Sequence, residues 1–464
     1  MLVTQARYFV ARLVDRKSAL HVAAAKGQAD LVKVLLDKGV NINARNANWP
    51  SYRWTALHHA ASKGHTEVVK VLLDRGAAID VMAQLDDGTA LHKAAQMGHI
   101  EAVKVLLDRG AAIDATNDYG WTTLHGAADR GHIEVVKLLL DRGATIDAMA
   151  DPGTALHLAV CEGHIEVVKV LLDRGAAIDA TNDYGWTTLH GAADRGQIEV
   201  AKLLLDRGVA IDATTSSDKC TALHWAASGG YTEVVRLLLD KGTAIDVMAN
   251  SRTALHWASD RGHIEVVKLL LDRGATIDAM ADSETALHLA VREGHIEAVK
   301  LLLDRGAAID AMADSGTALH LAADGGYLEA VKVLLDRGTN IHATNVEGRT
   351  ALHEACENGW RWSCRCHTKL VKALLERSTS TSIYVNFADK WGDTALHCAV
   401  RSTYRNAELI QLLLDNGTNT DWKNGSGETA LDIAHGRGWE RAVTLLTTAH
   451  MSKLARLLQI RHGN

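Results

Sequence analysis

The sequence predicts an all-α solenoid, in which short helix-turn-helix pairs stack in a row. The first observation is a tetrapeptide, Thr-Ala-Leu-His or a close variant, that begins thirteen segments mostly 32 to 34 residues apart. The second is that glycine recurs at regular intervals, whereas proline occurs only at Pro50 and Pro152. Frequent Leu, Ala and Val with almost no proline is typical of many short helices joined by tight turns. The full motif begins at Thr55, Thr89, Thr154, Thr221, Thr253, Thr285, Thr317, Thr350 and Thr394, and variants begin at Ser18, Thr122, Thr187 and Thr429.

Each segment contains a helical hairpin, for which residues 122–143 serve as the example. Thr122 is suited to the N-cap of a first helix, because its hydroxyl can accept a hydrogen bond from a backbone N–H. Gly131 follows that helix and Gly143 follows a second one, since glycine accepts the left-handed conformation after a helix end. Residues 133–142 carry the apolar stripe of the second helix. Residues 144–150 are expected to form an extended finger that leads to the next copy.

The hairpins must stack, because one hairpin alone cannot bury both of its apolar stripes. Residues 103–131 recur unchanged as 168–196, which indicates a duplicated block. The capping motif, hairpin and finger together resemble the ankyrin repeat, over about residues 18–447. The resemblance implies an ankyrin-repeat solenoid with β-hairpin-like fingers and a curved superhelix. The proline usual at the first helical position of that family is Ala or Thr here.

The predicted domain organisation has three parts. Residues 1–17 are expected to be a partial N-terminal capping repeat, with Tyr8–Val14 as its second helix. Residues 18–447 form the array of about thirteen repeats, with insertions near 360–366, 378–384 and 402–405. Residues 448–464 are expected to be a C-terminal capping helix and tail, with an amphipathic helix over Lys453–Ile460.

Composition narrows the function classes. The net charge of −6 is spread over the chain, so neither a nucleic acid nor an anionic membrane is expected as a partner. No apolar stretch is long enough to insert into a membrane. Six irregularly spaced cysteines favour a reducing compartment, so we expect a cytoplasmic or nuclear protein, and a monomer. No phosphate loop or nucleophile elbow is present, and no segment outside the repeats could house a catalytic domain, so neither an enzyme nor a cofactor is expected.

The 24 histidines are mostly part of the repeat. The resemblance implies that the motif histidines, and those after the glycine between the helices, make structural hydrogen bonds. One cluster leaves a metal site open as an alternative, because four soft ligands within twelve residues could hold zinc: Cys356, Cys364, Cys366 and His367. Its Cys-x-Cys-His spacing favours a reduced surface loop instead. The family's asparaginyl hydroxylation position is matched by Asn43 and Asn386.

The aromatic residues indicate where partners bind. The resemblance implies docking on a concave side formed by the finger tips and first helices. Tryptophan is favoured in such contacts because its rigid ring offers a large area at low entropy cost, although any one ring could instead brace neighbouring fingers. The candidate protein-binding residues are Trp49, Tyr52, Trp54, Tyr119, Trp121, Tyr184, Trp186, Trp225, Trp257 and Trp391.

A recurring finger methionine could add an adaptable strip or could fill space beneath the turns, and both interpretations stay open. It occurs at Met82, Met149, Met248, Met280 and Met312.

The sequence therefore predicts a non-catalytic scaffold or adaptor that binds other proteins. The alternative is a regulatory or targeting part of a larger enzyme or effector, suggested by a start inside a partial repeat. A further hypothesis is that the array is a substrate for hydroxylation.

Overall fold

The computed structural model describes residues 16–46, 53–83, 88–357, 364–378 and 381–462. These residues form helices α2 to α28 and two compact units, one of residues 1–226 with 240–243 and the other of residues 227–239 with 244–464. The expected helix over Tyr8–Val14 lies outside the described residues. In the first unit the helices are α2 (Arg16–Ala25), α3 (Ala29–Asp37), α4 (Ala56–Ser62), α5 (Thr66–Asp74), α6 (Ala90–Gln96), α7 (Ile100–Asp108), α8 (Thr123–Asp129), α9 (Ile133–Asp141), α10 (Ala155–Cys161), α11 (Ile165–Asp173), α12 (Thr188–Asp194) and α13 (Ile198–Asp206).

The division between the units passes through α14 (Ala222–Ser228) and α15 (Thr232–Asp240). The second unit continues with α16 (Ala254–Asp260), α17 (Ile264–Asp272), α18 (Ala286–Arg292), α19 (Ile296–Asp304), α20 (Ala318–Asp324), α21 (Leu328–Asp336), α22 (Ala351–Glu357), α23 (Cys364–Arg377), α24 (Thr381–Val385), α25 (Ala395–Arg401), α26 (Ala407–Asp415), α27 (Ala430–Gly436) and α28 (Glu440–His462).

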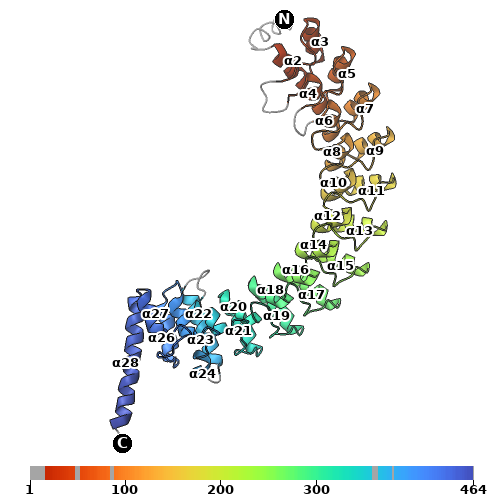
Figure 1. Cartoon of the computed structure of the whole chain (residues 1–464). Helices are drawn as coiled ribbons and strands as arrows, with labels where there is room; N and C mark the ends of the chain where they lie inside the picture. Colours follow the sequence, from red (N-terminus) through yellow and green to blue (C-terminus); the bar gives the residue numbers. More distant parts are fainter. Residues whose placement is uncertain (1–15, 47–52, 84–87, 358–363, 379–380, 463–464) are drawn as a thin grey trace. The chain divides into compact units, whose positions relative to one another are not determined.

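Within each unit the helices form two layers, as Figure 1 shows. The first helix of each pair packs on the first helix of the next pair, from α2 to α12 in one unit and from α16 to α27 in the other. The second helices pack on one another in the same order. The interior is built of small and aliphatic side chains, such as Leu124, Ala127 and Val136 in one pair, all of which are buried. The predicted all-α repeat solenoid is confirmed.

The fingers are simpler than hairpins. Five described fingers are closed by a single antiparallel bridge rather than by paired strands, as at Ala150 and Gly153. An aspartate or asparagine in most fingers accepts a hydrogen bond from a backbone N–H of the next finger. Asp80 accepts from Ala112 N at 3.0 Å, and Asp147 accepts from Ala177 N at 2.9 Å. These side chains therefore tie each such finger to the backbone of the next finger.

The motif histidine connects neighbouring repeats. His157 lies at the start of α10, where its Nε2 donates to Trp186 O of the next repeat at 3.1 Å. Because a carbonyl oxygen can only accept, the proton sits on Nε2 and leaves Nδ1 as an acceptor. That Nδ1 accepts from the N–H of Thr154 at 3.2 Å and from its hydroxyl at 2.9 Å. The capping threonine thus donates its hydroxyl to the histidine and also forms the predicted cap, because its oxygen faces the backbone N–H of the third helical residue; in the third repeat His92 N donates to Thr89 Oγ1 at 3.5 Å.

The histidine after the inter-helix glycine points the other way along the array. His132 Nε2 donates to Gln96 O of the preceding repeat at 2.9 Å. Gly131 and Gly143 have φ of 72° and 86°, as expected for residues that follow helix ends. The structural interpretation of these two histidine classes is confirmed where their bonds are described.

Replacing His157 with alanine is expected to lower the free energy of unfolding by about 2–3 kcal/mol. The change leaves the buried Thr154 N–H and the Trp186 carbonyl without their partner. Urea unfolding followed by circular dichroism measures the loss. The exposed His435 offers a matched control, because His435→Ala is expected to change stability by about 0.5 kcal/mol or less. Equal losses in the two variants would refute the structural role.

The insertions alter the helices of the later repeats. Residues 358–363 lie outside the described residues, and α23 begins directly after them. The finger insertion near 378–384 forms the extra helix α24, which buries Tyr384 against the ring of His342 at 5.3 Å. At the end of the chain, α28 runs unbroken over Glu440–His462. The segment expected as a separate helix over Lys453–Ile460 therefore continues the second helix of the last repeat.

Among the described residues, no helix combines the length and the apolar character needed to cross a membrane.

Candidate protein-binding surface

The candidate surface is called here the first-helix face. It consists of three register positions in each repeat: the finger, the residue before the motif threonine, and the exposed side of the first helix. Hydrogen bonds from the tying aspartates and the motif histidines to backbone groups fix these positions, so the other side chains displayed on them can vary without changing the scaffold. Of the ten predicted aromatic residues, Trp49 and Tyr52 lie outside the described residues. The other eight are half-buried or exposed on this face.

Trp54 lies in an aromatic cluster in the second repeat. Its ring is 4.9 Å from that of His59, which is itself 5.5 Å from the ring of His21. The ammonium group of Lys93 lies 5.6 Å from the Trp54 ring centroid. Burial, and to a smaller extent the nearby His21, lowers the pKa of His59 to about 4. The His59 imidazole is therefore uncharged near pH 7.

The duplicated fingers place two tryptophans at similar distances from their motif histidines. The Trp121 ring lies 6.3 Å from that of His125, and the Trp186 ring lies 6.1 Å from that of His190. Trp121 Nε1 also donates to Asp151 O of the next finger at 2.6 Å, so this ring braces a neighbouring finger. Tyr119 and Tyr184, in the same two fingers, are 54% and 63% exposed.

The structure brings one aromatic pair together from successive repeats. Trp186 precedes its motif threonine and Trp225 follows its motif histidine, yet their rings are 4.6 Å apart. Trp225 Nε1 is buried and makes no hydrogen bond within the described part of the chain, and the same holds for Trp257 Nε1 in the other unit. These two rings are positioned by packing rather than by a polar bond.

Trp391 is the most exposed described tryptophan of the later fingers, at 45%. Arg349 and Lys390 lie 5.4 Å and 4.4 Å from its ring centroid. Trp422 in the following finger donates its Nε1–H to Gly392 O at 3.1 Å, which makes it a brace. Four of the five finger methionines are 43–48% exposed, which favours the adaptable strip over space filling: Met149, Met248, Met280 and Met312.

Sequence reasoning missed the charged side chains that occupy the same positions in the second unit. Arg292 contacts Glu284 at 2.5 Å and Asp260 at 3.5 Å. Arg252 stands before its motif threonine, where earlier repeats have Trp54 and Trp121. Aligning the repeats at the residue before the motif threonine could have shown this change from aromatic to charged side chains.

Arg349 is the centre of a second charged group on this face. Its side chain is 12% exposed and pairs with Glu347, Glu354, Glu357 and Asp389, the last at 3.4 Å. Burial raises the pKa of Glu354 to about 7, against the opposing effect of Arg349. A hollow of about 270 Å³ lies beside Glu354 and is bordered by the finger around Glu347.

The zinc alternative gains no support from the described residues. Cys356 is buried, and burial raises the pKa of its thiol, which disfavours the thiolate that binds metal. His367 is also buried, and the side chains of Cys364 and Cys366 lie outside the described part. Within that part, no group of three or more His, Cys, Asp or Glu side chains is arranged to hold a metal ion.

Asn43 and Asn386 occupy the finger position whose side chain accepts a hydrogen bond from the backbone of the next finger. Asn43 Oδ1 accepts from Ala78 N at 2.9 Å, and Asn386 Oδ1 accepts from Asn419 N at 2.6 Å. Both asparagines therefore make the hydrogen bond to the next finger that aspartate makes in most other fingers.

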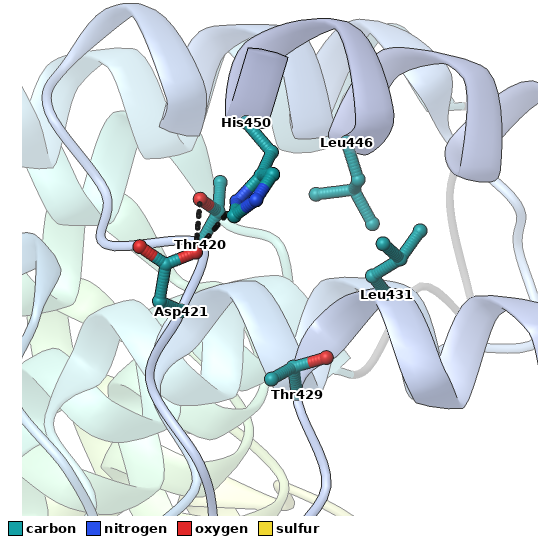
Figure 2. A pocket seen from close by; sticks show the side chains of 6 residues that line it. All are labelled: Thr420, Asp421, Thr429, Leu431, Leu446 and His450. Carbon is teal, nitrogen blue, oxygen red and sulfur yellow. Dashed lines mark hydrogen bonds and ion pairs between the residues drawn. The ribbon is translucent and has the colours of Figure 1, made fainter. Parts of the chain in front are cut away.

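The last finger contacts α28, as Figure 2 shows. Asp421 accepts from His450 Nδ1 at 2.7 Å, and Lys453 contacts its other oxygen at 2.6 Å. A small cavity of about 110 Å³ beside them is bordered by Thr429, Leu431 and Leu446. These contacts hold the long final helix against the end of the array.

A family model described as ankyrin repeats (3 copies) matches residues 3–83, 78–150, 147–215, 207–281, 278–345, 339–424 and 362–455. Ankyrin repeat and SOCS box protein 11 from Homo sapiens and from Pongo abelii is 42% identical over 64 residues, which is 14% of this chain and 18% of each relative. The crystal structure of the human ASB11 ankyrin repeat domain is 28% identical, with a TM-score of 0.43, over 48% of this chain and 97% of that one. The segment shared with the curated relatives is thus less than a fifth of their length.

Proposed function

This chain belongs to the ankyrin-repeat family, and from that premise we propose that it is a non-catalytic scaffold or adaptor that binds partner proteins on the first-helix face. The observation that supports this most is the set of large aromatic side chains left half-buried or exposed at the fingers and first helices of each unit. Their backbone is held by hydrogen bonds that do not depend on those rings. Rigid, partly exposed tryptophans are the side chains most enriched at the energetic centre of protein interfaces.

The working form in this proposal is a monomer in the cytoplasm or nucleus. Cys161, Cys220, Cys356 and Cys398 are unpaired thiols, as a reducing compartment requires. The shared segment with ASB11 is too short to transfer a partner, so the partner's identity has to come from capture.

Trp257→Ala is expected to weaken partner capture about tenfold or more without changing helical content. Trp257 makes no polar bond through its indole within the described residues, so truncation removes contact area and leaves no brace broken. Affinity capture from cell extract, quantified by mass spectrometry, measures the loss. Trp121→Ala is expected to weaken capture as well, but its bond to Asp151 O makes that variant less specific.

Ile264→Ala is the matched control for Trp257→Ala. Ile264 is 37% exposed and lies in α17, the second helix of the same repeat, so it removes apolar surface from the other layer. Capture should stay within about twofold of the unaltered chain. If Trp257→Ala and Ile264→Ala bind partners equally well, the first-helix face is not the docking surface.

A further inference from the structure

Three successive fingers of the second unit present an exposed methionine from the same finger position. These methionines, called here the methionine row, are Met248, Met280 and Met312, which are 43%, 46% and 47% exposed. The residue after each of them is an alanine that is at most 3% exposed: Ala249, Ala281 and Ala313. Because side chains alternate in direction along an extended segment, a buried alanine turns the preceding methionine away from the interior.

The backbone on both sides of these methionines is fixed by hydrogen bonds. At Met280, the carbonyl of the preceding residue accepts from Nε2 of the motif histidine His256 at 3.0 Å, and the N–H of the following residue donates to Glu284 O at 2.7 Å. The same two kinds of bond flank Met312, at 3.1 and 2.9 Å. The scaffold therefore positions the row without using the thioether side chains, which are left for contacts with a partner.

Neighbouring members of the row are one repeat apart. Their fingers are tied together, since Asp246 accepts from Thr276 N at 3.1 Å and Asp278 accepts from Ala308 N at 2.9 Å. The first helices α16, α18 and α20 of these repeats pack in succession, as Figure 1 shows, and packed helices lie about 8–10 Å apart.

This step matches the periodicity of an α-helix. Seven residues of a helix rise about 10.5 Å and return to nearly the same face, so side chains seven positions apart can reach successive methionines. Three residues of a β-strand span about 10 Å as well, but side chains three positions apart point to opposite faces. A helix along the row can therefore contact all of its members, whereas a strand cannot.

The surroundings of the row are acidic. The three fingers, residues 243–252, 275–284 and 307–316, contain six carboxylates and one arginine. Two of the carboxylates, Asp282 and Asp314, lie two residues after a methionine of the row and are exposed, and within the described part of the chain they make no hydrogen bond or ion pair. Apolar methionines bordered by carboxylates complement a helix that carries basic side chains beside an apolar stripe.

We propose that the methionine row binds an amphipathic α-helix of a partner protein, which carries apolar side chains every seven residues and basic side chains beside them. The proposal rests on the scaffold function proposed above and specifies the chemistry of the partner. Three anchors seven positions apart need a helix of at least about 15 residues, which is about 22 Å long. Unbranched thioether side chains adjust to anchors of different shape, so the row accepts leucine, isoleucine or phenylalanine at these positions.

Fluorescence anisotropy of the full chain with labelled helical peptides tests this proposal. The patterned peptide is an alanine-lysine helix of about 19 residues with three leucines seven positions apart. It is expected to bind at least about tenfold more tightly than a peptide of the same composition and charge whose leucines are dispersed around the helix. Replacing one central alanine of the patterned peptide with proline is expected to remove that advantage, because proline breaks the helix.

Met280→Gln is expected to weaken binding of the patterned peptide about fivefold, since glutamine keeps the length of the side chain but is polar. Met149→Gln is the matched control. Met149 holds the same finger position and is 48% exposed, but the neighbouring fingers have Thr116 and Thr181 there, so it does not belong to a row. Binding to that variant should stay within about twofold of the unaltered chain.

Equal binding of the patterned and dispersed peptides overturns the proposal, because it shows that the acidic fingers attract lysine whatever the apolar pattern. Equal losses in Met280→Gln and Met149→Gln overturn it too, and so does a proline peptide that binds as tightly as the patterned one. The Trp257 capture experiment uses none of these peptides. Absence of the peptide preference with Trp257-dependent capture intact refutes this partner chemistry alone, whereas capture that does not depend on Trp257 counts against the first-helix face.

Discussion

Lowering the pH from 7 to 5 is expected to lower the free energy of unfolding of the array. Burial lowers the pKa of nine motif histidines below the ordinary value of 6.5, and for His125 the pKa is about 4. The nine are His92, His125, His157, His190, His256, His288, His320, His353 and His397. In each, protonation would place a hydrogen on Nδ1, which already faces two threonine donors.

The sign of the effect follows from proton uptake. Unfolded histidine binds a proton below pH 6.5, whereas the folded imidazole stays neutral until the pH nears its lowered pKa. The stabilisation is therefore complete above pH 6.5 and is lost as the pH falls from 6.5 towards 4. For one fully buried histidine with the pKa of His125, the loss reaches about 3 kcal/mol. The lowered pKa values of the other eight motif histidines act in the same direction, so the array is expected to be less stable at pH 5 than at pH 7.

Urea midpoints at pH 7, 6 and 5, read by circular dichroism, measure this loss. The window excludes most carboxylate effects, because a carboxyl with a lowered pKa such as Asp393 loses its stabilisation only as the pH falls below about 4. A midpoint that stays constant between pH 7 and pH 5 would show that the motif histidines are not held neutral.

Arg349→Met is expected to lower the free energy of unfolding of the second unit by about 3–5 kcal/mol. The guanidinium group is the shared partner of Glu354 and Glu357, and of Asp389, whose side chain is fully buried. Removing one partner from a buried charge group is costly because the remaining charges are left uncompensated. Methionine keeps much of the arginine volume, so the loss reports charge more than packing.

Arg337→Met is the matched control for Arg349→Met, because it removes an arginine from an exposed ion pair. Arg337 pairs with Asp304 at 2.6 Å, but the two side chains are 41% and 59% exposed. An exposed pair contributes about 1 kcal/mol or less. Urea unfolding of both variants at pH 7.5 gives the two losses, and similar small values would show that the Arg349 group is solvated.

The repeat length and the hairpins could be predicted from sequence because most copies carry their own capping threonine and their own glycines after the helix ends. The expected helices around Thr122 appear as α8 and α9, with glycines in the left-handed conformation after each. The continuous α28 was not predicted, since a separate helix was expected over Lys453–Ile460, although residues 440–462 contain neither glycine nor proline to end the helix. The extra helix α24 was not predicted either, because an insertion has no counterpart in the other copies to align with.

The candidate surface was predictable in position but not in its contacts. Register alone placed Trp121, Trp186 and Trp225 on one face. Only the structure showed that Trp186 meets Trp225, while Trp121 bonds to the next finger. The Arg349 group was missed because its contact with Asp389 joins residues 40 positions apart, which no local pattern reveals.

The bond from each motif histidine to the next repeat has a consequence for how this family of surfaces evolves. Its acceptor is a main-chain carbonyl, supplied by Gly153, Trp186, Cys220 and Arg349 in different repeats. Every amino acid carries that oxygen, so a mutation at the position does not remove the acceptor. Binding specificity can therefore drift under selection at these positions while the inherited scaffold bond is kept.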